Sequence, residues 1–197
     1  MYKRQPEGRP LPETIEGRVT IVVEDDVSTG DMAPDGALGM SLWSNPPECA
    51  KHMFRRQDPD FHDRALEWGG GLVVGGHNYG QGSSREQAAL AALHLGIAAV
   101  VAKSFARIHR RNLVALGILP VVFADESDYE RAEQGQSWRI ERARSTVEDG
   151  SVELRAEVEG GEPVELLAEL SDGERKAVLA GGLLKLVREG GLAPAAR

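Results

Sequence analysis

A glycine-rich segment at residues 75–85 limits what this chain can fold into more than any other part of its sequence. It reads GGHNYGQGSSR, between a short apolar run at 71–75 and a run of strong helix formers at 86–95. The first run predicts a strand and the second a helix. Glycine permits backbone turns that other residues cannot make. Together the three parts predict a strand, a tight turn and a helix, the repeating unit of α/β folds.

The polar residues of this segment indicate an anion-binding turn. A helix begins with N–H groups that have no acceptor within the helix, and its dipole favours negative charge there. A Ser83 hydroxyl in that turn would lose its proton more readily, and Arg85 could hold a carboxylate. Gly80 and Gly82, on either side of Gln81, allow the backbone to approach a ligand closely. The alternative is that Ser83 only caps the helix, which is the commoner role of a lone serine there.

Three common glycine-containing loops do not fit the segment. The dinucleotide-binding pattern lacks its third glycine, because Arg85 stands where that glycine would fall. No Gly-Lys-Ser or Gly-Lys-Thr follows, so the phosphate loop of nucleoside triphosphatases is excluded. The residues around Ser83 do not form Gly-x-Ser-x-Gly, which excludes the nucleophile turn of the α/β-hydrolases.

Hydrophobic patterns elsewhere predict an α/β core followed by an antiparallel part. Strands are expected at 17–23, 98–102 and 118–123, and helices at 47–56 and 104–116. Alternating apolar and charged residues predict antiparallel strands with one wet face at 138–141, 152–158 and 164–168. Ser171 is expected to cap a last helix at 172–188.

The composition indicates one soluble domain. The chain has 197 residues, of which 41% are hydrophobic, so it is long enough to bury a single core. No apolar run reaches membrane-spanning length, and the N-terminus lacks the apolar core of a signal peptide, so a cytoplasmic location is expected. The net charge of −8 disfavours a general nucleic-acid surface. We expect an extended lead-in at 1–17, one domain at 18–189 and a fraying tail at 190–197.

A single cysteine limits the redox and metal chemistry of the chain. Cys49 cannot form an internal disulfide, and one thiol cannot hold an iron–sulfur cluster. Its neighbours predict a helix, so it is expected to be a core thiol. The histidines show no spacing typical of metal ligands, and no metal site is expected within the chain.

Several separated strings resemble one protein family, the swivel domain of the aconitase superfamily. The resemblance covers about residues 10–123 and is nearest to the short bacterial aconitase type, with the small subunit of isopropylmalate dehydratase more distant. It implies a three-layer swivelling β/β/α domain within the α/β class. The strings that carry it, in the family's order, are 10–17, 27–31, 58–60, 67–71, 78–86, 102–109, 112–113 and 117–120.

The resemblance implies a reaction for the glycine segment. Aconitase-type enzymes interconvert 2-hydroxy and 3-hydroxy acids by removing and re-adding water. Ser83 would act as an alkoxide that takes the proton from the carbon beside the leaving hydroxyl. Ser84 and Arg85 would bind a substrate carboxylate. A 4Fe–4S cluster serves as the Lewis acid in these enzymes, and it is expected on a partner chain or on missing domains.

Three positions depart from the family pattern. Thr29 and Asp31 are candidates for the substrate pocket, but Gly30 stands where the family carries an acidic residue, so Asp31 does not simply inherit that role. Trp43 stands where aconitases carry a carboxylate-binding arginine, which an indole cannot replace. Either Trp43 is a core residue or the alignment slips there, or the substrate carries an apolar or aromatic group at that point. Gln87 replaces a histidine and is expected to change helix packing.

The favoured interpretation is a small (swivel) subunit, or a fragment, of an iron–sulfur hydro-lyase that isomerises citrate and isocitrate. Such a chain would be active only with a cluster-bearing large subunit, and its other partner would be the small hydroxy acid. An isopropylmalate-like acid is the alternative substrate. A non-catalytic binding or regulatory module is the alternative of another class, although the intact residues 83–85 argue against it. No membrane or nucleic-acid partner is expected.

Overall fold

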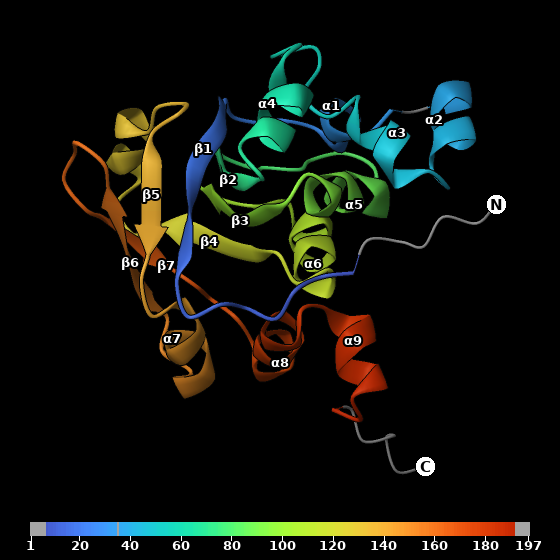
Figure 1. Ribbon diagram of the computed structural model, residues 1–197. Coiled ribbons are helices and arrows are strands. Elements are labelled where there is room, and N and C mark those ends of the chain that lie inside the picture. The colour runs from blue at the N-terminus through green and yellow to red at the C-terminus, as the bar shows by residue number, and fades with distance from the viewer. Residues whose placement is uncertain (1–6, 35, 192–197) are drawn as a thin grey trace.

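One closed, mixed sheet organises the structure (Figure 1). The computed structural model describes residues 7–34 and 36–191. Within them, the strands follow one another around the sheet in the order β1–β2–β3–β4–β7–β6–β5. The strands are β1 (Ile15–Val23), β2 (Gly71–Gly75), β3 (Ile97–Ala102), β4 (Leu119–Phe123), β5 (Ser137–Ile140), β6 (Glu153–Val158) and β7 (Val164–Leu167).

Strands β1 to β4 pair in parallel. Helix α5 (Glu86–His94) connects β2 to β3, and α6 (Arg107–Ala115) connects β3 to β4. Parallel neighbours need such crossovers because the chain must return to the edge where the previous strand began. Strand β2 is buried along its whole length, as a strand covered on both faces should be. The strand, turn and helix predicted around the glycine segment are therefore confirmed.

The remaining strands pair antiparallel, as their alternating pattern predicts. The α/β class is confirmed, but the β-strands form one closed sheet where separate layers were expected. Strand β1 explains the closure, because its first half, Ile15 to Arg18, pairs with β5 and its second half, from Val19 onward, pairs with β2. Pairing between β4 and β7 completes the circuit.

Three helical regions differ from the prediction, and the first is the helix expected at 47–56, which is only α3 (Pro46–Ala50) and is followed by turns. The last helix, expected at 172–188, breaks into α8 (Asp172–Ala180) and α9 (Leu183–Arg188). The break is at Gly181 and Gly182, whose φ angles of 86° and 117° end a right-handed helix. Helix α7 lies where only a turn was expected between two strands; it is seven residues long, too short for a clear period. The other helices are α1 (Thr29–Met32), α2 (Gly36–Leu42), α3 (Pro46–Ala50), α4 (Phe61–Glu67), the 3-10 helix η1 (Glu126–Arg131), α7 (Ala143–Asp149), α8 (Asp172–Ala180) and α9 (Leu183–Arg188).

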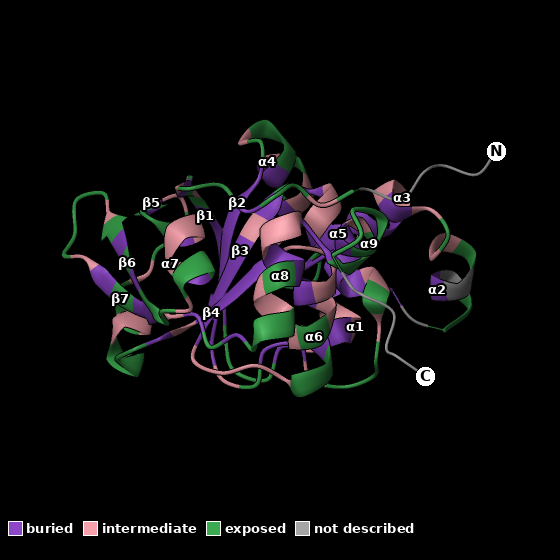
Figure 2. Ribbon diagram, turned by 90° about the horizontal axis from the view of Figure 1, so that it is seen from below, coloured by how far each residue is buried: buried purple, intermediate pink, exposed green. Residues whose placement is uncertain are grey.

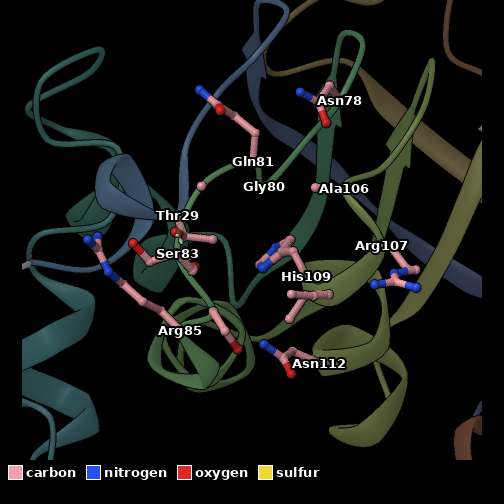
Figure 3. Close-up of a pocket in the computed structure, with 13 residues that line it drawn as sticks. Thr29, Asn78, Gly80, Gln81, Ser83, Arg85, Ala106, Arg107, His109 and Asn112 are labelled. Atoms are coloured by element: carbon pink, nitrogen blue, oxygen red, sulfur yellow. Dashed lines mark hydrogen bonds between the residues drawn. The ribbon is translucent and has the colours of Figure 1, made fainter.

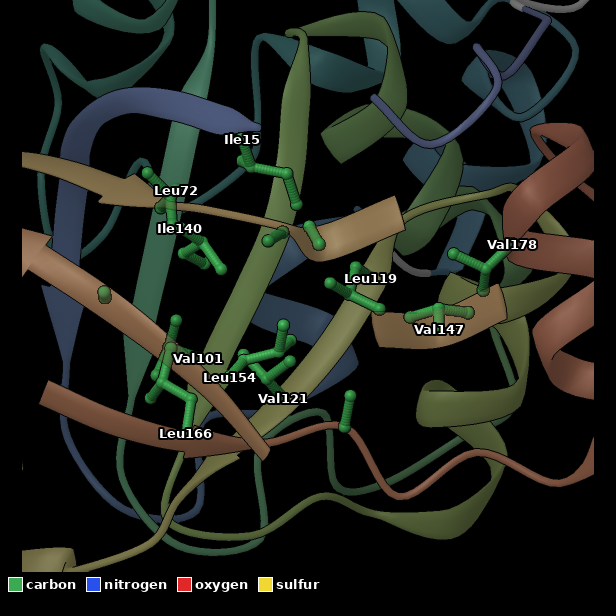
Figure 4. Packing of buried hydrophobic residues seen from close by; sticks show 14 of the residues in the cluster. Ile15, Leu72, Val101, Leu119, Val121, Ile140, Val147, Leu154, Leu166 and Val178 are labelled. Atoms are coloured by element: carbon green, nitrogen blue, oxygen red, sulfur yellow. The ribbon is translucent and has the colours of Figure 1, made fainter. Parts of the chain in front are cut away.

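Two clusters of buried side chains lie on opposite faces of the parallel strands. One fills the interior of the closed sheet and extends under α7 and α8 (Figure 4). The other lies under α3, α4 and α5. Strand β2 contributes to both, since Leu72 and Val74 face the first cluster and Val73 the second. Figure 2 shows these strands as a buried layer beneath the exposed faces of the helices.

The described residues before β1 pack against helix α8. Strand β1 begins at Ile15, and Leu11 before it is buried and donates its N–H to the carbonyl of Leu179 at 3.3 Å. Residues 1–6 of the expected lead-in and 192–197 of the expected tail lie outside the described part of the chain. Within the described part, no helix has the length and apolar character needed to cross a membrane.

Truncating a side chain inside the closed sheet should destabilise the whole domain. Leu119 is fully buried in the inner cluster, so we expect Leu119→Ala to lower the free energy of unfolding by about 2–5 kcal/mol. Leu184→Ala is the matched control, because the Leu184 side chain is 63% exposed and should contribute less than about 0.5 kcal/mol. Urea unfolding of the two variants measures the difference. Equal effects would show that the inner cluster does not hold the domain together.

Candidate active site

The glycine segment leaves the carboxyl end of β2 and meets two other loops at the same edge of the sheet. Residues 24–28 follow β1 and residues 103–106 follow β3. Isolated parallel bridges join Ser28 to Gln81 and Tyr79 to Phe105, so the glycine segment lies between these two loops. Loops at the carboxyl edge of parallel strands are the usual place for a ligand site in α/β proteins.

Backbone hydrogen bonds fasten the glycine segment to the loop after β1. The carbonyl of Val27 accepts the N–H groups of Gly80 at 2.9 Å and Gln81 at 3.2 Å. Thr29 donates its N–H to the carbonyl of Gln81 at 2.9 Å and its hydroxyl to the carbonyl of Ser83 at 2.8 Å. Thr29, a candidate pocket residue from the sequence, thus fixes the backbone of the candidate base.

Gly80 lies against the ring of His109 at the start of α6. Its φ angle is +82°, and a Cβ placed on it would lie 2.3 Å from ring atoms of His109. The ring of Tyr79 packs against the same imidazole at 5.5 Å between centroids. His109 is only 2% exposed, and burial lowers its pKa to about 4, so the ring is neutral at physiological pH. The spacing of the histidines does not indicate this contact, because it depends on how α6 packs against the glycine segment.

A pocket of about 360 Å³ opens between the glycine segment and α6 (Figure 3). It brings together the candidate site residues Ser83, Ser84 and Arg85, with Ser83 and Ser84 exposed to solvent. The size suits a small molecule. Sequence reasoning missed the wall that α6 provides. The described residues lining the pocket are Thr29, Asn78, Gly80, Gln81, Gly82, Ser83, Ser84, Arg85, Ala106, Arg107, Ile108, His109 and Asn112.

Ser83 is not the cap of α5. The helix begins at Glu86, and its N-cap residue is Arg85, which makes no side-chain capping hydrogen bond. The alternative that Ser83 serves only as a cap is therefore wrong. Arg85 is half-buried and donates from Nη1 to the carbonyl of Ala33 at 3.3 Å, which ties its guanidinium to the end of α1.

Asp31 and Trp43, the other two candidates, lie outside the lining of this pocket. Asp31 forms a capping box at the start of α1, where Ser28 donates its hydroxyl to Oδ2 at 2.6 Å. Burial raises the pKa of Asp31, but hydrogen bonds from Ser28 outweigh it and leave the pKa below its ordinary value. The Trp43 indole donates to the carbonyl of Pro34 at 3.1 Å.

Cys49 is buried in α3, as predicted, and burial raises the pKa of its thiol to about 11. A thiol with so high a pKa is neither a ready nucleophile nor a ready metal ligand. In the part of the chain that the structure describes, no group of three or more His, Cys, Asp or Glu side chains is arranged to hold a metal ion. The described residues therefore do not fit an iron–sulfur cluster.

Comparison with known proteins relates this chain to aconitases and to small subunits of isopropylmalate dehydratase. A family model described as "Aconitase C-terminal domain" matches residues 40–126. The chain is 35% identical over 181 residues to 3-isopropylmalate dehydratase small subunit 1 of Methanopyrus kandleri, covering 92% of this chain and 96% of the relative. It is 54% identical over 72 residues to a probable mitochondrial aconitate hydratase of Dictyostelium discoideum, but these are 36% of this chain and only 9% of that relative.

A solved structure agrees with the sequence relationship. The crystal structure of 3-isopropylmalate dehydratase (leuD) from Methanocaldococcus jannaschii superimposes with a TM-score of 0.73 and 30% sequence identity. The match covers 90% of this chain and 95% of that chain, so it extends over both the parallel and the antiparallel strands.

Buried His109 should make stability fall with falling pH. Its pKa is about 4 in the folded chain against an ordinary 6.5, so between these values the unfolded chain binds more protons at this residue. Protonation there favours unfolding, by about 3 kcal/mol over the whole window. Urea unfolding at pH 7 and pH 4 should show a smaller pH-dependent loss for His109→Phe than for the unchanged chain. An identical pH-dependent loss of stability in both proteins would show that His109 is not a buried, neutral residue in the folded chain.

Proposed function

This chain belongs to the family of aconitase C-terminal domains and 3-isopropylmalate dehydratase small subunits, and we propose that it is the small subunit of a hydro-lyase. The observation that carries the proposal is the pocket in which Ser83, Ser84 and Arg85 lie together, with both hydroxyls open to solvent. The reaction is the removal and return of water between adjacent carbons of a hydroxy acid.

Ser83 is the base in this proposal. As an alkoxide it takes the proton from the carbon beside the leaving hydroxyl, becomes a hydroxyl, and returns the proton when water adds back. A serine hydroxyl is far too weak an acid to ionise unaided, so the first N–H groups of α5 must stabilise the alkoxide. The hydrogen bond of Thr29 to the carbonyl of Ser83 supports this role, because it fixes the backbone from which the hydroxyl projects.

Ser84 and Arg85 hold a substrate carboxylate. A guanidinium and a hydroxyl can both donate to one carboxylate, and the charge-assisted pair is the stronger contact. Arg85 follows Ser84 directly in the loop, so a carboxylate bound there would lie next to the base. The contact of Arg85 with the carbonyl of Ala33 limits its rotamers and supports a fixed carboxylate position.

The pocket is one half of an active site, and the other half is expected on a cluster-bearing large subunit. The described residues of this chain offer no ligand set for a cluster. The pocket opens at the surface, where Ser83 and Ser84 are exposed. An exposed base beside a bound carboxylate needs a partner that covers it and activates the leaving hydroxyl. Heteromer formation is thus part of the proposal.

We place the substrate in the class of 3-isopropylmalate, a 2-hydroxy acid with two carboxylates and an apolar branch. The relative that matches along 92% of this chain carries that name, and so does the solved structure. Citrate and isocitrate are the second candidate, favoured by the higher identity of 54% to an aconitate hydratase within a shorter segment of 72 residues.

Replacing the base tests the proposal. Ser83→Ala, assembled with a cluster-bearing large subunit, should lower turnover of isopropylmalate or citrate by about 10²- to 10⁴-fold, the usual contribution of a general base. Thermal unfolding should not change, because the Ser83 side chain is exposed. Ser151→Ala is the control, since Ser151 is exposed and lies outside the pocket lining. Wild-type turnover by the Ser83 variant would end the catalytic interpretation.

A further inference from the structure

The pocket has a second wall that the proposed function does not use. It consists of the start of α6, from Ala106 to His109, and of Asn112 one turn further on. Figure 3 shows this wall facing the loop that carries Ser83 and Arg85, with the His109 ring projecting from α6 toward that loop.

The electrostatics of this wall favour an anion. Helix α6 is nine residues long, its N-cap Ala106 provides no side-chain cap, and its first turn contains no acidic residue. The N–H groups at such a start attract negative charge. Arg107 is exposed and forms no ion pair within the described residues, whereas Arg110 on the same helix pairs with Glu174 at 2.6 Å. The wall is thus positive in a chain whose net charge is −8.

Two buried polar atoms on this wall have no hydrogen-bond partner in the part of the chain that the structure describes. They are Nδ1 of His109, in a side chain that is 2% exposed, and the amide nitrogen Nδ2 of Asn112. Leaving a buried donor unpaired costs free energy, and natural proteins seldom accept that cost without a reason. Residues three apart lie on one face of a helix, so both side chains belong to the same wall.

We propose that the start of α6, with Arg107, His109 and Asn112, is a second carboxylate subsite. The inference rests on the proposed function in that the ligand is the second carboxylate of the same diacid, while Ser84 and Arg85 hold the first. The amide of Asn112 donates to the carboxylate, Arg107 supplies the opposite charge, and the imidazole of His109 donates when its proton is on Nδ1. Two subsites on facing walls select acids with two carboxylates over acids with one.

Succinate is a suitable probe, because it has two carboxylates and no hydroxyl to eliminate. In a titration of the full chain followed by NMR, we expect succinate to shift the amide signals of residues 107–109 and the side-chain amide of Asn112, together with those of 83–85. Asn112→Asp should weaken succinate binding about tenfold to hundredfold, since a donor is replaced by a repelling charge. Acetate should bind more weakly than succinate.

Matched arginine variants keep the test decisive if Asn112→Asp folds poorly. Arg107→Ala should weaken succinate binding, whereas Arg111→Ala should not, because Arg111 is exposed on the same helix but does not line the pocket. Two results would overturn the subsite, because each would show that the start of α6 attracts any anion. One is an equal effect of the two variants on succinate binding. The other is that sulfate, at equal ionic strength, shifts the same signals as strongly as succinate does.

Different measurements test the second carboxylate subsite and the proposed function. Shifts confined to 83–85, or no shift at all, would overturn the second subsite. Neither result bears on Ser83, whose role is decided by turnover of the assembled Ser83→Ala enzyme.

Discussion

Gly80 has no side chain, and the ring of His109 occupies the space that a side chain would take. This contact sets how closely the glycine segment approaches α6. On the opposite side, the carbonyl of Val27 accepts hydrogen bonds from this segment, and Thr29 donates hydrogen bonds to it. A short stretch of backbone held between two neighbouring loops has little conformational freedom. The residues that follow it, Ser83 to Arg85, therefore project from a fixed backbone.

The clamp explains how an exposed loop can carry out chemistry that needs accurate placement. Loops on a protein surface are normally mobile, and catalytic loops are effective when a rigid scaffold positions them. Here the scaffold is the parallel half of the sheet, whose strands β1, β2 and β3 each deliver one of the three loops. The proposed base, Ser83, comes from the middle loop, and the facing wall comes from α6, the helix after the third loop. In the proposed function, the exposed side of the pocket, where Ser83 and Ser84 lie, is the side that a partner subunit covers.

Local structure was largely predictable from the sequence, and long-range structure was not. Strand β2 and helix α5 follow from short apolar and helix-forming runs that need no distant partner. Closure of the sheet depends on β1 pairing with both β2 and β5, which are far apart in the sequence. His109 and Asn112 fall within segments that resemble the aconitase family, but only the packing of α6 against Gly80 brings them to the pocket. Likewise, Gly181, where α8 ends, lies against the backbone of Arg9, a residue far away in the sequence.

Turnover of the assembled enzyme with Gly80→Ala measures whether the contact between Gly80 and His109 positions the proposed base. The added methyl group cannot fit against the His109 ring, so the segment must shift, and a shift of about 1 Å at reacting groups can cost about 10²-fold in rate. We expect a loss of that order in a chain that circular dichroism shows to be folded. Wild-type turnover by folded Gly80→Ala would contradict the account.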